Sequence, residues 1–155
     1  MPDFDARVDA LGLTLYGPHP PHDPLDAVVV FERIARTSGQ LPRIDGLLVC
    51  TGTLGLDVSV EQGFEAARVC ALNALSVLRA SLGTLNRISR ILTVTGYVAS
   101  APGFFQQPAV MDGASLLLHS IFGEAGRHTR SAIGVAALPR GGAVEIEVTA
   151  AVLPL

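Results

Sequence analysis

The chain has 155 residues and no lysine: all 11 basic residues are arginine, against 14 acidic residues, which gives a formal net charge of −3. The absence of lysine excludes any mechanism that needs a Schiff-base lysine or the lysine of a phosphate-binding P-loop. The negative charge argues against a nucleic-acid partner, because that affinity depends on many contacts between basic side chains and phosphates. A cation in a site of this protein must therefore be arginine, histidine or a bound ion.

The length suits one domain, but the chain is poor in charge for a monomer. Only 16% of its residues are charged and 49% are hydrophobic, whereas about 25% of residues are charged in typical globular proteins. The longest charge-free stretch, residues 91–111, holds prolines and several Thr, Ser and Gln residues and does not predict a membrane-spanning helix. The acidic start does not resemble a signal peptide. We therefore expect a cytoplasmic protein with no membrane partner, whose surplus apolar surface is buried between subunits.

Residues 1–26 are rich in proline and histidine and predict an N-terminal arm with little regular structure. The single domain is then expected to occupy residues 27–155. Residues 25–37 are rich in β-forming side chains and predict a strand. A turn at residues 44–46 and a short second strand over residues 47–52 are predicted to follow.

Two helices are predicted downstream. Over residues 59–82 the apolar side chains recur at alternating steps of three and four, which is typical of a helix with one buried face. Ser59 and Gln62 can form a capping box at its start, and Gly83 stands where a helix-ending glycine belongs. A second helix is predicted over residues 108–122, with a proline in its first turn.

Three further strands are predicted, over residues 88–98, 130–137 and 144–152, and a turn over residues 138–142 joins the last two. The complete order is two strands, a helix, a strand, a helix and two strands. That order predicts an α+β fold in which two helices cover one face of a mostly antiparallel sheet.

Arg130 is the candidate binding residue that the pattern alone provides. Glu145 and Glu147 share one side of the last strand, and the preceding strand can be aligned so that Arg130 and Ala132 join that side, away from the helices. An unpaired guanidinium there would be costly, so either a glutamate or a ligand carboxylate should pair with it. The neighbouring residues 127–128 are expected to be solvated.

Other signatures of chemistry are missing. The sequence contains no dinucleotide-binding, serine-hydrolase or zinc-protease motif. His19 and His22 are spaced like a metal pair, but no third ligand is in evidence, so no metal site is predicted. Cys50 and Cys70 are predicted to be free thiols, since their spacing fits neither a metal site nor a redox motif.

Two segments resemble the signatures of a known family. Residues 38–42 (Ser-Gly-Gln-Leu-Pro) resemble the first signature of the RidA family, also called YjgF or endoribonuclease L-PSP. Residues 130–139, followed by Val-Glu-Ile-Glu at 144–147, resemble its C-terminal signature. The order of elements is similar over residues 25–152. The chain most resembles a longer branch of the family, which has an N-terminal arm and an insertion corresponding to residues 123–128.

The resemblance implies a chorismate-mutase-like α+β fold and a homotrimer, in which the sheets form a central barrel and a site lies in each of three clefts between subunits. It also implies an enzyme, a deaminase of the hydrolase class. This enzyme would convert reactive 2-imino (enamine) acids, released by pyridoxal enzymes, to 2-oxo acids and ammonia. The partner is then a small-molecule carboxylate, a 2-imino or 2-oxo acid, and no metal or organic cofactor is needed.

The resemblance also assigns roles to residues. Arg130 matches the arginine that binds the substrate carboxylate. Glu145 matches the glutamate that positions or activates the attacking water. Gly39 matches a backbone position that lines the cleft.

Three further positions depart from the family pattern. Leu25 stands where active deaminases usually carry a substrate-facing tyrosine, and Ala132 replaces a frequent cysteine. Asp112 lies at or near a family asparagine, where a carboxylate would repel an acidic substrate unless it is protonated or paired. These departures leave open a non-catalytic trimer that binds small carboxylic acids as a metabolite sensor or accessory protein. An internal pair of Arg130 with Asp112 would favour a site that no longer binds acids.

The sequence supports two other functions less well. The charge of −3 and the 5% content of aromatic residues disfavour an endoribonuclease or translation inhibitor. A chorismate mutase would rest on analogy of fold alone.

Overall fold

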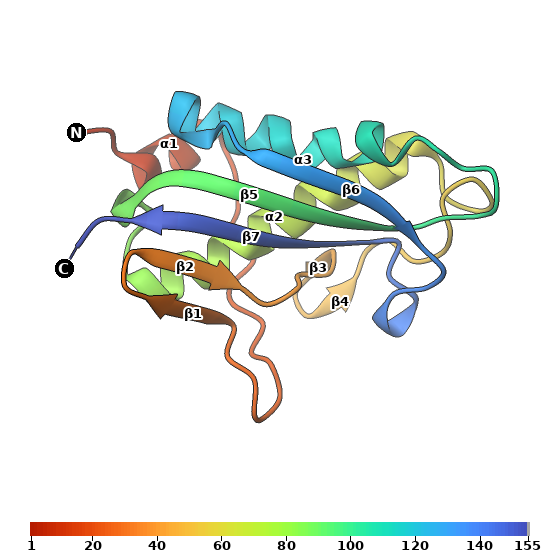
Figure 1. The fold of residues 1–155 in the computed structure, drawn as a ribbon, viewed down its shortest axis with the longest axis horizontal. Helices are drawn as coiled ribbons and strands as arrows, with labels where there is room; N and C mark the ends of the chain where they lie inside the picture. The colour runs from red at the N-terminus through yellow and green to blue at the C-terminus, as the bar shows by residue number, and fades with distance from the viewer. Residues whose placement is uncertain (155) are drawn as a thin grey trace.

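The computed structural model describes residues 1–154 and shows a twisted sheet with its helices packed on one side (Figure 1). The main sheet has five strands in the order β1-β2-β7-β5-β6. These are β1 (Val28–Phe31), β2 (Ile34–Thr37), β5 (Ile88–Ala99), β6 (Thr129–Val135) and β7 (Val144–Val152). Every pair of neighbours is antiparallel except β5 and β6, which are parallel and joined through a helix. The predicted α+β class with a mostly antiparallel sheet is confirmed.

Two long helices, α2 (Val60–Leu82) and α3 (Gln107–Phe122), cover one face of this sheet (Figure 1). The capping box of Ser59 and Gln62 forms as predicted, and Gly83 ends α2 in the left-handed conformation with φ 85°. The two helices approach closely at Gly113, where a Cβ atom would lie 2.0 Å from the carbonyl oxygen of Phe64. Only glycine fits there, so the packing of α3 on α2 depends on this residue.

The first predicted strand is wrong in its extent, because a tight turn divides it into β1 and β2 and Glu32 adopts a left-handed φ of 53°. The predicted strand over residues 47–52 is also shorter than expected. It contains only β4 (Leu47–Leu48), which pairs with β3 (Arg43–Ile44) in a separate two-stranded hairpin. The predicted turn before it is confirmed: Asp45 and Gly46 have φ values of 52° and 79°, as a two-residue hairpin loop requires.

The N-terminal arm contains a helix, α1 (Phe4–Ala10), which contradicts the expectation of little regular structure. Asp3 caps it by accepting a hydrogen bond from the amide of Ala6. A seven-residue helix is marginal alone and depends on tertiary packing. Phe4 supplies that packing, since its ring is buried and lies 4.6 Å from the ring of Phe122 on α3. The signal was present as an acidic cap followed by apolar residues four apart, Phe4 and Val8.

Residues 1–154 also contain three short 3-10 turns: η1 (Leu85–Arg87), η2 (Gly123–Gly126) and η3 (Pro139–Gly141).

Candidate functional site

The register of the strands decides on which face of the sheet each predicted site residue lies. Arg130 on β6 pairs with Val94 on β5, whereas Glu145 on β7 pairs with Tyr97 on β5. Side chains of paired residues point to the same face, and positions 94 and 97 of one strand point to opposite faces. Val94 is fully buried beneath the helices. Arg130 therefore lies on the helix-covered face, and Glu145 lies on the opposite face, which we call the open face.

The prediction that Arg130 and Ala132 share a face with the glutamates is wrong. Ile133 pairs with Tyr97 and is 46% exposed on the open face. Ala132 instead packs against the core. The alternation in β6 is ambiguous because small residues occupy one side of the strand and β6 forms an edge of the sheet.

Arg130 is bound by α3. Its Nη1 donates to Asp112 Oδ1 at 2.9 Å and to Ser115 Oγ at 3.1 Å, and its Nη2 lies 3.4 Å from the carbonyl oxygen of Pro108. The side chain of Arg130 is 20% exposed and that of Asp112 is 52% exposed. Two partners were left open for Arg130, a strand glutamate or a ligand carboxylate; the glutamate alternative is wrong, since Asp112 is the side chain that pairs with Arg130. Among the bonds within residues 1–154, Nε takes no part, so the Nε side of the fork stays available to a ligand.

His128 extends this group. Its Nδ1 lies 2.6 Å from the carbonyl oxygen of Gly126, and its Nε2 lies 2.9 Å from Ser115 Oγ. Since a carbonyl oxygen only accepts, Nδ1 carries a proton, and Nε2 shares a hydrogen bond with the Ser115 hydroxyl. His128 is half-buried and both of its ring nitrogens are bonded, so its predicted solvation is wrong. Arg127 is solvated as expected, with its side chain 68% exposed.

Glu145 is held against the backbone at Gly39. Two hydrogen bonds between Gln40 and Ile146 place the Ser-Gly-Gln segment alongside β7. A Cβ atom on Gly39 would lie only 2.1 Å from Glu145 Oε1. Burial raises the pKa of the half-buried Glu145, and the neighbouring Glu147 carboxylate raises it further. A carboxyl group with a raised pKa holds a proton more readily than an ordinary glutamate does, which suits a proton carrier.

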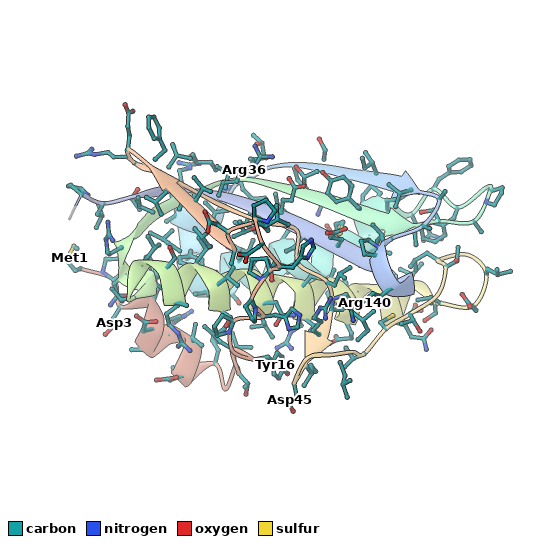
Figure 2. All side chains as sticks on the ribbon, turned by 90° about the horizontal axis from the view of Figure 1, so that it is seen from below. Met1, Asp3, Tyr16, Arg36, Asp45 and Arg140 are labelled. Carbon is teal, nitrogen blue, oxygen red and sulfur yellow. The ribbon has the colours of Figure 1, made fainter. Side chains whose placement is uncertain are left out.

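Glu147 is already occupied on both oxygens. Arg36 Nη2 binds Oε2 at 3.2 Å, and the Tyr97 hydroxyl donates to Oε1 at 3.0 Å. Figure 2 shows Arg36 on the side of the sheet away from the helices. Glu145 is therefore the carboxylate left free to act on the open face. The place of Tyr97 was not predicted, although its alternation with Val94 and Val98 put it on the polar side of its strand.

The N-terminal arm meets the segment that contains Gly39. The amide of Ser38 donates to the carbonyl oxygen of Ala27, and its hydroxyl donates to that of Asp26. Leu25 lies just before this junction and is 52% exposed. The six predicted site residues thus form two groups. One contains Arg130, Asp112 and Ala132, and the other contains Glu145 and Gly39, with Leu25 close along the chain.

Within residues 1–154, no group of three or more His, Cys, Asp or Glu side chains is arranged to hold a metal ion. In the same part of the chain, no helix is long and apolar enough to cross a membrane.

Comparison with known proteins identifies the class that this fold and these segments define. The profile of the family described as "YjgF/chorismate mutase-like, putative endoribonuclease" matches residues 11–148. The chain therefore belongs to the YjgF family, also called RidA or endoribonuclease L-PSP, and has its chorismate-mutase-like fold.

Several relatives are similar over nearly the whole chain. Protein TCP17 of Trypanosoma cruzi is 41% identical over 143 residues, which cover 92% of this chain and 89% of that protein. The crystal structure of Atu1372 from Agrobacterium tumefaciens, a protein of unknown function, has a TM-score of 0.89 at 36% identity, covering 97% of this chain and 94% of that one. A structure from Shewanella oneidensis that bears the same endoribonuclease description has a TM-score of 0.93 at 32% identity, covering 97% and 99% of the two chains.

Proposed function

We propose that this protein hydrolyses 2-imino acids to 2-oxo acids and ammonia, at sites completed between copies of the chain. The observation that carries the proposal is Glu145, a half-buried carboxyl group with a raised pKa, held against Gly39 on the open face. Membership of the YjgF family supports the same class of reaction.

The separation of Arg130 from Glu145 supports a site shared by two chains. One chain holds them on opposite faces of its sheet, so a single substrate needs Arg130 from one copy and Glu145 from another. The open face also carries exposed apolar side chains that another copy would cover, namely Val29, Phe31 and Ile133, which are 55%, 73% and 46% exposed. We propose the homotrimer of the family as the assembly that joins the two groups.

In the proposed reaction, Arg130 binds the substrate carboxylate through the free Nε side of its fork and so fixes the imine carbon near Glu145. The oxygen of a water molecule bonds to that carbon while Glu145 takes one water proton and passes it to the imine nitrogen, which gives a carbinolamine. Glu145 then moves the hydroxyl proton to the amine, the carbon–nitrogen bond breaks, and ammonia leaves as the 2-oxo acid forms. Water supplies every atom that the substrate lacks.

A second candidate is a non-catalytic trimer that binds small carboxylic acids. Leu25 and Ala132 favour it, because neither side chain offers a polar group to a reacting substrate. In this alternative, Arg130 binds the acid through its free Nε side and turnover is absent. The ion pair of Arg130 with Asp112 argues against both candidates, because the Asp112 carboxylate competes with a ligand carboxylate and neutralises part of the positive charge.

The two candidates are separated by following imine decay with the purified protein. Threonine dehydratase or an amino-acid oxidase supplies the imine, and its decay is compared for wild type, Arg130→Ala, Glu145→Gln and a control, Arg33→Ala, in an exposed turn. We expect faster decay with wild type and the control only. If the imine decays no faster with wild type than with Arg130→Ala, the hydrolase is excluded. Titration with 2-oxobutyrate would then test the binding trimer.

A further inference from the structure

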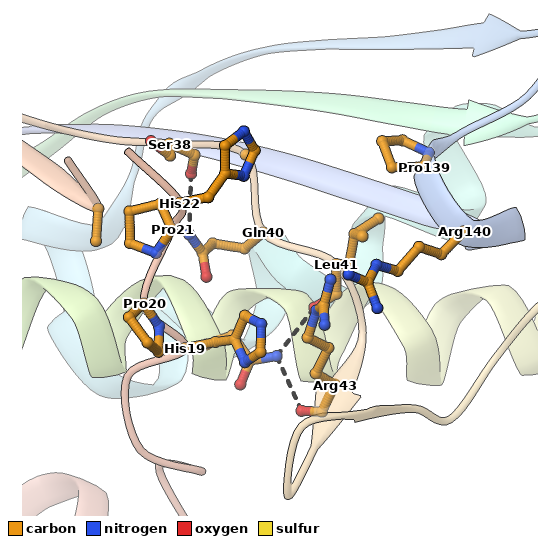
Figure 3. A pocket seen from close by; sticks show the side chains of 13 residues that line it. His19, Pro20, Pro21, His22, Ser38, Gln40, Leu41, Arg43, Pro139 and Arg140 are labelled. Carbon is orange, nitrogen blue, oxygen red and sulfur yellow. Dashed lines mark hydrogen bonds between the residues drawn. The ribbon is translucent and has the colours of Figure 1, made fainter. Parts of the chain in front are cut away.

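A partly enclosed cavity of about 340 Å³ lies beneath the N-terminal arm. We call it the arm pocket; its walls are formed by residues 19–22 of the arm, residues 38–41 after β2, Arg43 of β3, Asn73 of α2 and Arg140 of η3 (Figure 3). These segments are far apart in the sequence and meet only in the folded chain. Arg130 and Glu145 do not line it.

The charge of the arm pocket is positive and uncompensated. Arg43 and Arg140 line it together with His19 and His22, and no Asp or Glu from residues 1–154 contributes to its wall. Neither arginine belongs to any ion pair in this part of the chain. Burial, and then the charge of Arg140, lower the pKa of Arg43, and burial and both arginines lower the pKa of His19. Two cations that share a cavity without a counter-charge favour an anionic ligand.

The backbone holds both arginines in place. Arg140 has a left-handed φ of 58° and ψ of 18°, which is an uncommon and costly conformation for a residue other than glycine. The turn around it is fixed because the amide of Gly142 donates to Pro139 and the amide of Gly52 donates to Gly141. On the other side, the buried Asn73 donates from Nδ2 to the carbonyl oxygen of Arg43 at 2.9 Å. Figure 3 shows the two guanidinium groups directed toward each other.

The rest of the wall is compact and largely apolar. Pro20 and Pro21 of the arm face Leu41 across the cavity, while Ser38 and Gln40 add polar groups (Figure 3). Proline restricts the backbone, so the arm is preorganised and loses little entropy when a ligand binds. A ligand with one strongly charged end and a small, weakly polar body fits this arrangement.

We propose that the arm pocket binds the phosphoryl group of a small phosphate monoester, with Arg43 and Arg140 as its two ligands. Two guanidinium groups offer more parallel donors than one carboxylate can accept, whereas the oxygens of a phosphoryl group accept from both. Gly39 borders both the arm pocket and Glu145, but the inference does not depend on imine hydrolysis, because the proposed phosphate ligands are Arg43 and Arg140.

Isothermal titration calorimetry with inorganic phosphate and glycerol 3-phosphate tests the proposal. The proteins are wild type, Arg43→Gln, Arg140→Gln, Arg140→Lys and the control Arg33→Gln, which removes the same charge from an exposed turn. We expect saturable binding by wild type and control. Each glutamine variant should bind about tenfold to a hundredfold more weakly, the range for losing one charge-assisted pair. Arg140→Lys should lose less, because it keeps the charge but not the fork.

Three results would overturn the inference. The first is no saturable binding of either phosphate compound, which would also result if another copy of the chain fills the pocket. The second is equal binding by wild type and Arg140→Gln while circular dichroism shows both folded. The third is acetate or succinate binding as tightly as glycerol 3-phosphate, which would assign the pocket to carboxylates. Arg130→Ala should bind phosphate as tightly as wild type does. Loss of imine hydrolysis in this variant therefore does not bear on the phosphate-binding proposal.

Discussion

Gly39 and Glu145 are in direct contact: a single methyl group on Gly39 would occupy the position of the carboxylate, 2.1 Å from Oε1. The contact joins the first family segment to the last strand. It also gives Gly39 a physical role, because any side chain at this position must displace the group that we propose as the proton carrier.

Replacing Gly39 by alanine should therefore reduce turnover more than stability. The displaced atom is the end of a flexible side chain, so the fold can adapt while the carboxylate moves out of position. We expect kcat for imine decay to fall by about tenfold or more, the scale of misplacing a catalytic group, while the melting temperature changes little. The second substitution is Glu145→Asp, whose shorter side chain leaves room for a methyl group at Gly39. In the double variant, kcat should therefore fall by less than the product of the two single reductions. Additive losses would contradict the contact.

Subunit complementation tests whether two chains share one site. Arg130→Ala and Glu145→Gln should each be inactive alone, but co-expressed chains should recover activity, because some interfaces combine the intact Arg130 of one chain with the intact Glu145 of another. Random assembly in equal amounts restores about a quarter of the sites at a head-to-tail interface. The assembly is checked by light scattering. Mixed assemblies without activity would show that the two residues do not act in one shared site.

Asp112→Asn should strengthen the binding of small acids at Arg130. The asparagine removes the competing negative charge and still offers an oxygen to Nη1. Because Asp112 is half exposed, the ion pair contributes only about 0.2–1 kcal/mol to stability, so the folding cost should be small. Titration with 2-oxobutyrate, compared between wild type and variant, measures the change. Weaker binding by the variant would mean that Asp112 itself contacts the ligand.

The raised pKa of Glu145 makes stability depend on pH with a definite sign. The folded state binds the carboxyl proton of Glu145 more tightly than the unfolded state does. The stability that this proton contributes is complete below the ordinary pKa of 4.5 and is lost as the pH rises through the raised pKa. Glu145→Gln should therefore gain stability relative to wild type as the pH increases above the ordinary value of 4.5 and through the raised value. Denaturant unfolding at several pH values measures this, with exposed Glu65→Gln as the control. A constant difference would contradict the raised pKa.

Phe4→Ala tests the contribution of α1. The ring is buried against Phe122, so its loss should cost about 3 kcal/mol of unfolding free energy. Leu11→Ala, at a side chain 41% exposed just beyond the helix, should cost much less. Equal effects of the two substitutions in urea unfolding would show that α1 is not docked.

The sequence by itself determined the elements whose signals are local. The capping box at Ser59 and the glycine at 83 set the ends of α2, because capping groups and backbone conformation depend only on near neighbours. Regular alternation placed Glu145 and Glu147 together on one face, since successive side chains of a strand point to opposite sides. The family segments at residues 38–42 and 130–139 were likewise legible from the chain, and the family itself is confirmed.

The tertiary structure alone decided where Arg130 points and what it meets. Because β6 contains small residues, its alternation is compatible with Arg130 on either face of the sheet. The pairing of Arg130 with Val94 places it on the helix-covered face. Its partner Asp112 comes from a different element and reaches it only because α3 packs over the edge of the sheet. The arm pocket has the same origin: Arg43 and Arg140 are nearly a hundred positions apart, and no periodic pattern encodes a meeting that packing alone creates.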